Sequence, residues 1–169
     1  MTRSEKALYT AKVRTTGGRD GASRSSDGRL GVKLSTPGTP GSGTNPEQLF
    51  AAGWSACFEG AMALAAREMK IALPADAAIN AEVDLKANDG AYFLAARLEV
   101  SLLGLEREAA LRPIEAAHRT CPYSKATRGN IDVVVSVVRT DTQNPGVPHG
   151  LTATHHDRAD ADLPAFIDA

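Results

Sequence analysis

Residues 45–66, NPEQLFAAGWSACFEGAMALAA, constrain the fold more than any other stretch, because they form one long and almost wholly apolar run. A membrane span is one explanation, but the run is short for a bilayer, contains Ser55 and Glu59, and is built from Ala and Gly rather than Leu and Ile. The chain of 169 residues, 43% of them hydrophobic, can form a globular core. We therefore expect a long buried helix and no membrane partner.

The start and the face of this helix can be predicted from residue types. Thr44 and Asn45 offer a side-chain cap, Pro46 suits the first turn, and Glu47 stands where the helix dipole favours an acid. Gly53 and Gly60 weaken a helix by up to about 1 kcal/mol each, which predicts close approach of another backbone at this face. The face carries Leu49, Gly53, Cys57, Gly60 or Ala61, and Leu64.

The order of elements predicts one α+β domain with largely antiparallel sheet. Strand patterns cover residues 7–16, the two sides of Asp27-Gly28, the two sides of Asn88-Asp89-Gly90, and the run IDVVVSVV. A second helix is expected from Glu106 to Thr120, shortened or bent at Pro113. The long helix is expected to be followed by an exit segment, IALPADAA, that Pro74 closes.

Charge divides the chain into residues 1–140 and an extension, 141–169. The extension is rich in Pro, Gly and Asp and carries five Asp against one Arg, whereas residues 1–140 carry +18 − 15 = +3. We assign no chemistry to the extension, including His155 and His156. The formal net charge of −1 and the lack of a Lys/Arg cluster argue against nucleic acid as a partner. The N-terminus has no apolar segment of a secretory signal, so a cytoplasmic location is expected.

The chain has two cysteines, Cys57 within the long helix and Cys121 in HRTCPYSKATRGN. In a cytosolic protein such a pair is more often catalytic, redox-active, metal-binding or simply buried than a disulfide scaffold. Residue type alone leaves these alternatives open. His118 and Tyr123 are neighbours of Cys121 to which we assign no role, while Phe50, Trp54 and Phe58 fit either an apolar substrate pocket or core packing.

Three segments, GGRDG, TNPEQLFAAGWSACF and AHRTCPYSKATRGNIDV, together resemble the organic hydroperoxide resistance (Ohr) subgroup of the OsmC/Ohr family over residues 7–138. The resemblance implies antiparallel sheets packed around a long central helix in an intertwined homodimer. It implies a peroxidase that reduces alkyl or fatty-acid hydroperoxides, with a dithiol of a lipoylated protein as the reductant and with neither cofactor nor metal. Residues 141–169 extend beyond the usual end of this subgroup.

By position, the resemblance makes Cys57 the peroxidatic thiol, Cys121 the resolving thiol, and Arg19 with Glu47 the pair that activates Cys57. A thiol of ordinary pKa is mostly protonated at neutral pH, so the attacking thiolate needs a cation beside it. Arg19 suits that role, and Glu47 can orient the guanidinium through a charge-assisted hydrogen bond.

The spacing of Glu47 and Cys57 predicts a site shared between two chains. Ten residues of regular helix span about 15 Å, which is too far for one arginine head to contact both side chains. We therefore expect an obligate homodimer in which Glu47 or Arg19 of one protomer approaches Cys57 of the other.

Two alternatives from other functional classes remain. The first is a metal-binding protein that uses Cys57, Cys121 and His118, although no fourth ligand is evident. The second is a non-catalytic dimeric ligand-binding module in which both cysteines are structural.

Overall fold

The computed structural model of the chain describes residues 6–138, and the chain divides after Leu49 into two compact units. The expected extension, 141–169, with His155 and His156, lies outside the described residues.

The first unit is a three-stranded antiparallel sheet in the order β1-β2-β3. Its elements are β1 (Val13–Thr16), the short 3-10 helix η1 (Gly18–Asp20), β2 (Ala22–Ser25) and β3 (Gly31–Lys33). The hairpin predicted at Asp27-Gly28 is confirmed, with Gly28 at a φ of 76° and Asp27 accepting hydrogen bonds from Ser25 Oγ and the Arg29 N–H.

The strand predicted for residues 7–16 was wrong at its start, because β1 begins only at Val13. The ladder explains the difference: Val13 pairs with Ser25, the last residue of β2, and the chain then turns at Asp27. Beyond this pair the Ser26 N–H still donates to the Lys12 carbonyl, and within the described part of the chain no strand pairs with residues 7–11. Sequence alternation favours an extended chain but does not provide a neighbouring strand.

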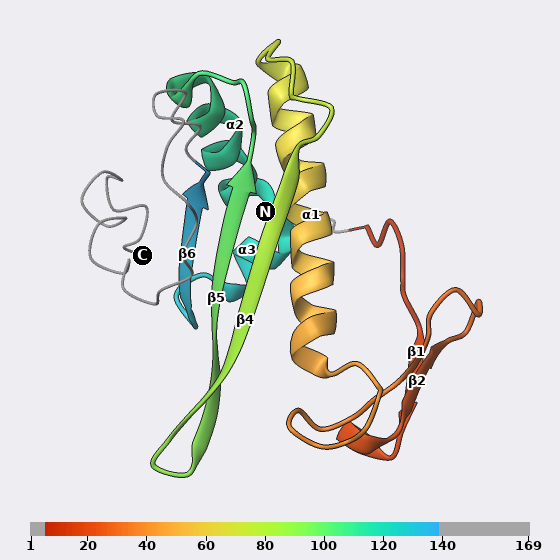
Figure 1. Cartoon of the computed structure of the whole chain (residues 1–169). Coiled ribbons are helices and arrows are strands. Elements are labelled where there is room, and N and C mark those ends of the chain that lie inside the picture. Colours follow the sequence, from red (N-terminus) through yellow and green to blue (C-terminus); the bar gives the residue numbers. More distant parts are fainter. Residues whose placement is uncertain (1–5, 139–169) are drawn as a thin grey trace, which may run out of the picture. The chain divides into compact units, whose positions relative to one another are not determined.

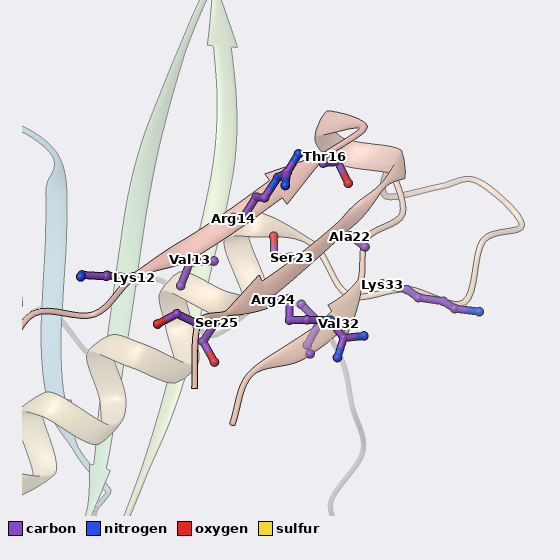
Figure 2. A pocket seen from close by; sticks show the side chains of 12 residues that line it. Lys12, Val13, Arg14, Thr16, Ala22, Ser23, Arg24, Ser25, Val32 and Lys33 are labelled. Carbon is purple, nitrogen blue, oxygen red and sulfur yellow. The ribbon is translucent and has the colours of Figure 1, made fainter. Parts of the chain in front are cut away.

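A hollow of about 760 Å³ lies on this sheet, and Figure 2 shows the side chains that line it. Four of them are cations, Lys12, Arg14, Arg24 and Lys33, and none is a carboxylate. None of the predicted site residues lines this hollow.

The second unit contains a sheet in the order β4-β5-β6. Strands β4 (Ala78–Asn88) and β5 (Ala91–Ser101) form the predicted antiparallel hairpin, and β6 (Asp132–Val137) pairs with β5 in parallel. Asp89 and Gly90 both have positive φ, which is the backbone of a tight hairpin turn. The parallel pairing of β6 follows from the helices that intervene after β5 and carry the chain back to the other end of the sheet.

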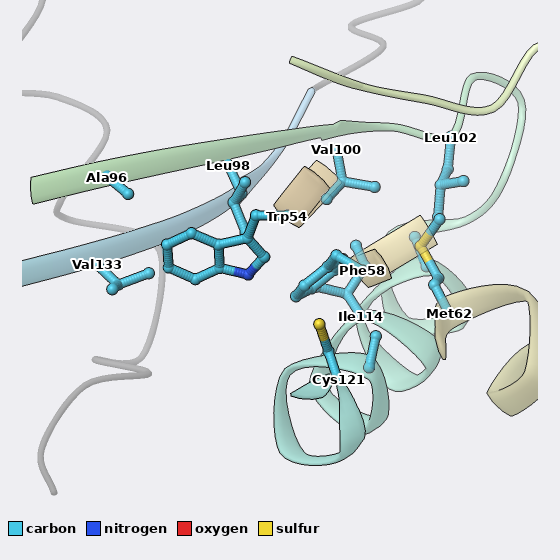
Figure 3. Packing of buried hydrophobic residues seen from close by; sticks show 12 residues of the cluster. Trp54, Phe58, Met62, Ala96, Leu98, Val100, Leu102, Ile114, Cys121 and Val133 are labelled. Carbon is cyan, nitrogen blue, oxygen red and sulfur yellow. The ribbon is translucent and has the colours of Figure 1, made fainter. Parts of the chain in front are cut away.

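Three helices complete the described part of the fold: α1 (Pro46–Glu68), α2 (Arg107–Thr120) and α3 (Pro122–Thr127). In the second unit α1 and α2 pack on the same face of the sheet, as Figure 1 shows. Figure 3 shows the core between them, in which Trp54, Phe58 and Met62 of α1 meet alternate residues of β5 and one face of α2. By length and composition alone α1 could cross a membrane, but the core helix of a soluble protein passes the same test.

The start of α1 is as predicted, since Asn45 Oδ1 accepts a hydrogen bond from the Gln48 N–H at 2.8 Å. As predicted, the segment IALPADAA lies beyond the end of the helix. The helix closes at Glu68, where Lys70 adopts a φ of 58° and the Ile71 N–H bonds to the Ala66 carbonyl. This is a Schellman cap whose left-handed position, usually glycine, is occupied by a lysine, so no glycine marks it in the sequence.

Pro113 lies inside α2 and is buried, and the helix continues to Thr120, so the predicted shortening does not occur. Sequence analysis did not anticipate α3, which begins directly after Cys121 with Pro122 at its first position.

The solvent-exposed face of the sheet is charged. Arg97 of β5 donates two hydrogen bonds to Asp84 and one to Glu82, both on β4. These charged side chains are therefore paired with one another within the sheet.

Candidate active site

The two cysteines meet in the second unit. Cys57 lies on α1 and Cys121 at the junction of α2 and α3, and their Sγ atoms are 3.1 Å apart. Both are free thiols. Cys57 is half-buried, whereas Cys121 is completely buried. The thiols are thus in contact, and only Cys57 has exposed surface.

Local hydrogen bonds fix Cys121. Its N–H donates to the Ala117 carbonyl at the end of α2, and its own carbonyl accepts from the Lys125 N–H in α3. The residue is therefore held from both sides of a sharp change in chain direction. This junction presents Cys121 to the face of α1.

The aromatic residues around the thiols belong to the core. Trp54 and Phe58 are fully buried, and the Trp54 indole N–H donates to Ser124 Oγ at 3.2 Å. Phe50 is partly buried and contacts Trp54 edge to face at 5.5 Å between ring centroids. For Trp54 and Phe58, core packing is the interpretation that the structure supports.

Burial raises the pKa of the Cys57 thiol, and the neighbouring Cys121 raises it further. A hydrogen bond from the backbone N–H of Tyr123 lowers the same pKa and only partly offsets these effects. The surroundings of Cys57 in the second unit therefore favour the neutral thiol. A thiolate at neutral pH needs a cation in addition.

Arg19 and Glu47 form a bidentate ion pair in the first unit. Arg19 Nη2 donates to Glu47 Oε1 at 2.6 Å, and Nη1 donates to Oε2 at 3.0 Å. The ion pair holds the pKa of the Glu47 carboxyl below its ordinary value and raises the pKa of Arg19. The Glu47 side chain is 12% exposed and that of Arg19 41%, so the guanidinium keeps an accessible side.

The loop GGRDG explains how Arg19 is presented. Arg19 lies in η1, which follows Gly17 at a φ of 73°. A Cβ at Gly21 would overlap the carbonyl oxygen of Thr16, so the tight return of the chain requires glycine there. The predicted residues thus meet as two pairs, Arg19 with Glu47 and Cys57 with Cys121.

His118 lies in the last turn of α2, and its ring is 6.4 Å from that of Phe58. Its Nδ1 is buried and has no hydrogen-bond partner among residues 6–138. Burial lowers the pKa of the imidazole, with a smaller contribution from Arg128. Among residues 6–138, no three side chains of His, Cys, Asp or Glu cluster in a way that could hold a metal ion.

The roles of two residues in this site were not predicted from the sequence. Ser124 anchors Trp54, and Tyr123 approaches both Gly53 and Cys57. The close approach predicted at Gly53 is real, but it is made by a side chain rather than by another backbone. Around Gly60, no described residue lies within 4 Å of the position of an added Cβ. Gly53 was a signal for the Tyr123 contact, whereas nothing in the sequence pattern pointed to the Ser124–Trp54 bond.

Comparison with known proteins decides the family. The family model described as OsmC-like protein matches residues 38–136. An organic hydroperoxide resistance protein of Xanthomonas axonopodis pv. citri (strain 306) is 45% identical over 141 residues, which cover 81% of this chain and 99% of the relative. This chain belongs to the Ohr subgroup of the OsmC family.

Solved structures of OsmC-family proteins share the fold. The crystal structure of the organic hydroperoxide resistance protein OhrB of Bacillus subtilis gives a TM-score of 0.74 at 44% identity and covers 78% of this chain and all of that one. A structure of a similar Vibrio cholerae protein, with captopril bound in one of its active sites, gives a TM-score of 0.74 at 41% identity over 80% of this chain and 95% of that one. The OsmC/Ohr fold and the α+β class predicted from the sequence are confirmed.

Proposed function

We propose that this protein is a thiol-dependent peroxidase that reduces organic hydroperoxides to alcohols, with Cys57 as the peroxidatic residue and Cys121 as the resolving residue. The observation that carries the proposal is the 3.1 Å contact between the two Sγ atoms. The names of the Xanthomonas and Bacillus relatives, which refer to organic hydroperoxide resistance, support the substrate class.

In the first step the Cys57 thiolate attacks the distal oxygen of the hydroperoxide. An S–O bond forms, the O–O bond breaks, and the alkoxide takes a proton and leaves as the alcohol. Cys57 becomes a sulfenic acid. The partial exposure of Cys57 and the complete burial of Cys121 favour this order, because a substrate reaches an exposed residue first.

In the second step the Cys121 sulfur attacks Cys57 sulfur, and the hydroxyl of the sulfenic acid leaves as water. A disulfide bond is about 2.05 Å long, so the two sulfur atoms need to approach by only about 1 Å. Fast closure protects Cys57 from further oxidation. An external dithiol then reduces the disulfide by exchange, and a dihydrolipoyl group of a lipoylated protein is the reductant that we propose.

Arg19 supplies the positive charge that Cys57 needs, and Glu47 positions it. The pKa of Cys57 is raised by its surroundings in the second unit, so a cation has to stabilise the thiolate. The bidentate pair fixes the guanidinium plane and leaves Arg19 partly exposed for a sulfur or peroxide oxygen. Glu47 also competes with the Cys57 thiolate for the positive charge of Arg19, so we assign Glu47 an orienting role.

We further propose that the active protein is a cytoplasmic homodimer with one peroxidase domain, residues 1–140, in each protomer. Helix α1 is continuous from Pro46 to Glu68, which is the condition for the expected shared site. Because Arg19 and Glu47 pair within one chain, they would act together on Cys57 of the partner.

A peroxidase assay with purified protein tests this function. Consumption of cumene hydroperoxide and of hydrogen peroxide is followed with dihydrolipoamide or glutathione as the reductant. We expect turnover with cumene hydroperoxide and dihydrolipoamide, and much slower turnover when either is replaced. Absence of dithiol-dependent consumption of any hydroperoxide by the reduced protein would remove the proposal.

A further inference from the structure

Gly53 lies one turn before Cys57 on α1, so the two residues share a face of the helix. A Cβ added at Gly53 would lie 2.8 Å from Tyr123 Oη and 3.3 Å from Tyr123 Cζ. Real Cβ atoms do not approach other atoms so closely. The absence of a side chain at position 53 therefore makes the slot that the Tyr123 phenol occupies.

The other side of the Tyr123 ring is also held. Its centroid lies 5.8 Å from that of Phe50, with the ring planes at 61°, which is an edge-to-face contact. The next residue, Ser124, is buried and accepts the hydrogen bond from the Trp54 indole. Two consecutive residues after Cys121 are thus anchored to the face of α1 that carries Cys57.

This anchored segment touches the peroxidatic sulfur through its main chain. The backbone N–H of Tyr123 interacts with the Cys57 side chain and lowers the pKa of its thiol. A backbone donor cannot be removed by substitution, but its place depends on the ring that holds the segment down. Loss of that ring frees residue 123 to move away from α1.

We propose that Tyr123 is a positioning residue for Cys57: its ring, seated in the slot at Gly53 and against Phe50, holds the Tyr123 N–H on the Cys57 sulfur. The donor stabilises the thiolate, because a hydrogen bond to the charged form of a group favours that form. Gly53 is required for the same reason, since any side chain there displaces the ring. The inference rests on the proposed function only in taking Cys57 as the reacting thiol.

The test measures the pH at which Cys57 reacts half-maximally with iodoacetamide. All proteins carry Cys121→Ser, so that one thiol is titrated, and circular dichroism confirms that each is folded. We expect Tyr123→Ala to raise the midpoint by about 1 pH unit, which slows alkylation about tenfold below the midpoint. Tyr123→Phe keeps the ring and should raise the midpoint by less than half as much.

Gly53 gives an independent arm with a matched control on the same helix. Gly53→Ala should raise the midpoint as Tyr123→Ala does, whereas Gly60→Ala should not, because no described residue lies within 4 Å of its added Cβ. Adding Tyr123→Phe to Gly53→Ala removes the closest contact and should lower the midpoint again.

A Tyr123→Ala protein with the parental midpoint, or equal midpoints for Gly53→Ala and Gly60→Ala, would contradict the proposal. The alkylation readout does not require peroxide turnover. An inactive parent would therefore count against the proposed function alone, and the midpoints would still decide the role of Tyr123.

Discussion

The Sγ atoms of Cys57 and Cys121 lie 3.1 Å apart, although 64 positions separate the two residues in the chain. One thiol is half-buried on α1, and the other is fully buried where α2 meets α3. This difference in exposure is the basis of the different roles that we propose for the two cysteines.

Cys57→Ser should abolish peroxide consumption, since no other accessible thiol remains. Cys121→Ser should still consume one equivalent of cumene hydroperoxide per Cys57, but should recycle poorly because the disulfide cannot form. Peroxide titration with mass spectrometry of Cys57 measures both effects. Full turnover by Cys57→Ser in the presence of a dithiol would contradict the assignment.

Arg19→Lys should lower kcat/KM for cumene hydroperoxide by about 100-fold, because lysine keeps the charge but cannot make the bidentate contact with Glu47. Arg29→Lys is the control, because Arg29 is in the same unit and largely exposed. Its ion pair is long, with 3.9 Å between Arg29 Nε and Asp27 Oδ2. Thermal melting verifies that both variants fold. Near-normal activity of a folded Arg19→Lys protein would remove the special role of this arginine.

The shared site can be tested by mixing inactive chains. Cys57→Ser and Glu47→Ala chains refolded together should form heterodimers with one intact site if Glu47 acts on the partner's cysteine. About half of the dimers in a random mixture are heterodimers, and each has one of its two sites intact. About a quarter of the parental activity should therefore return. Each variant refolded alone is the control. Recovery of no activity from a mixture with verified heterodimers would place Glu47 and Cys57 of the same chain in one site.

Ser124→Ala should lower the free energy of unfolding by about 1–3 kcal/mol, because it leaves the buried Trp54 N–H without its acceptor. Ser55→Ala is the matched control on α1, where the serine is half-buried and bonds only to the Ala52 carbonyl. That change should be nearly neutral. Urea unfolding followed by tryptophan fluorescence measures both, and equal midpoints for the two variants would refute the importance of the bond.

Stability should fall as the pH drops through about 6.5, because the pKa of His118 is lower in the folded protein than in the unfolded chain. The unfolded state then binds the proton more readily. His118→Gln should lose less stability than the parent between pH 7.5 and pH 5.5 in urea unfolding experiments. An identical loss in both proteins would show that other groups cause the acid sensitivity.

Elements with local signals could be predicted from the residue pattern. Asn45 and Pro46 mark the start of α1 through cap and first-turn chemistry, and Asp89-Gly90 defines the β4–β5 hairpin through its positive φ angles. The motifs around Arg19, Glu47, Cys57 and Cys121 indicated the family without any knowledge of their contacts. These features depend on residues close together in the chain, so a one-dimensional pattern carries them.

Features that depend on distant partners became visible only in the folded chain. β1 begins at Val13 because β2 offers no partner earlier, and β6 runs parallel to β5 because of the helices between them. The Tyr123 phenol fills the space that Gly53 leaves open, 70 positions away from it in the chain. Such contacts depend on where the folded chain brings side chains together, and no local propensity encodes that path.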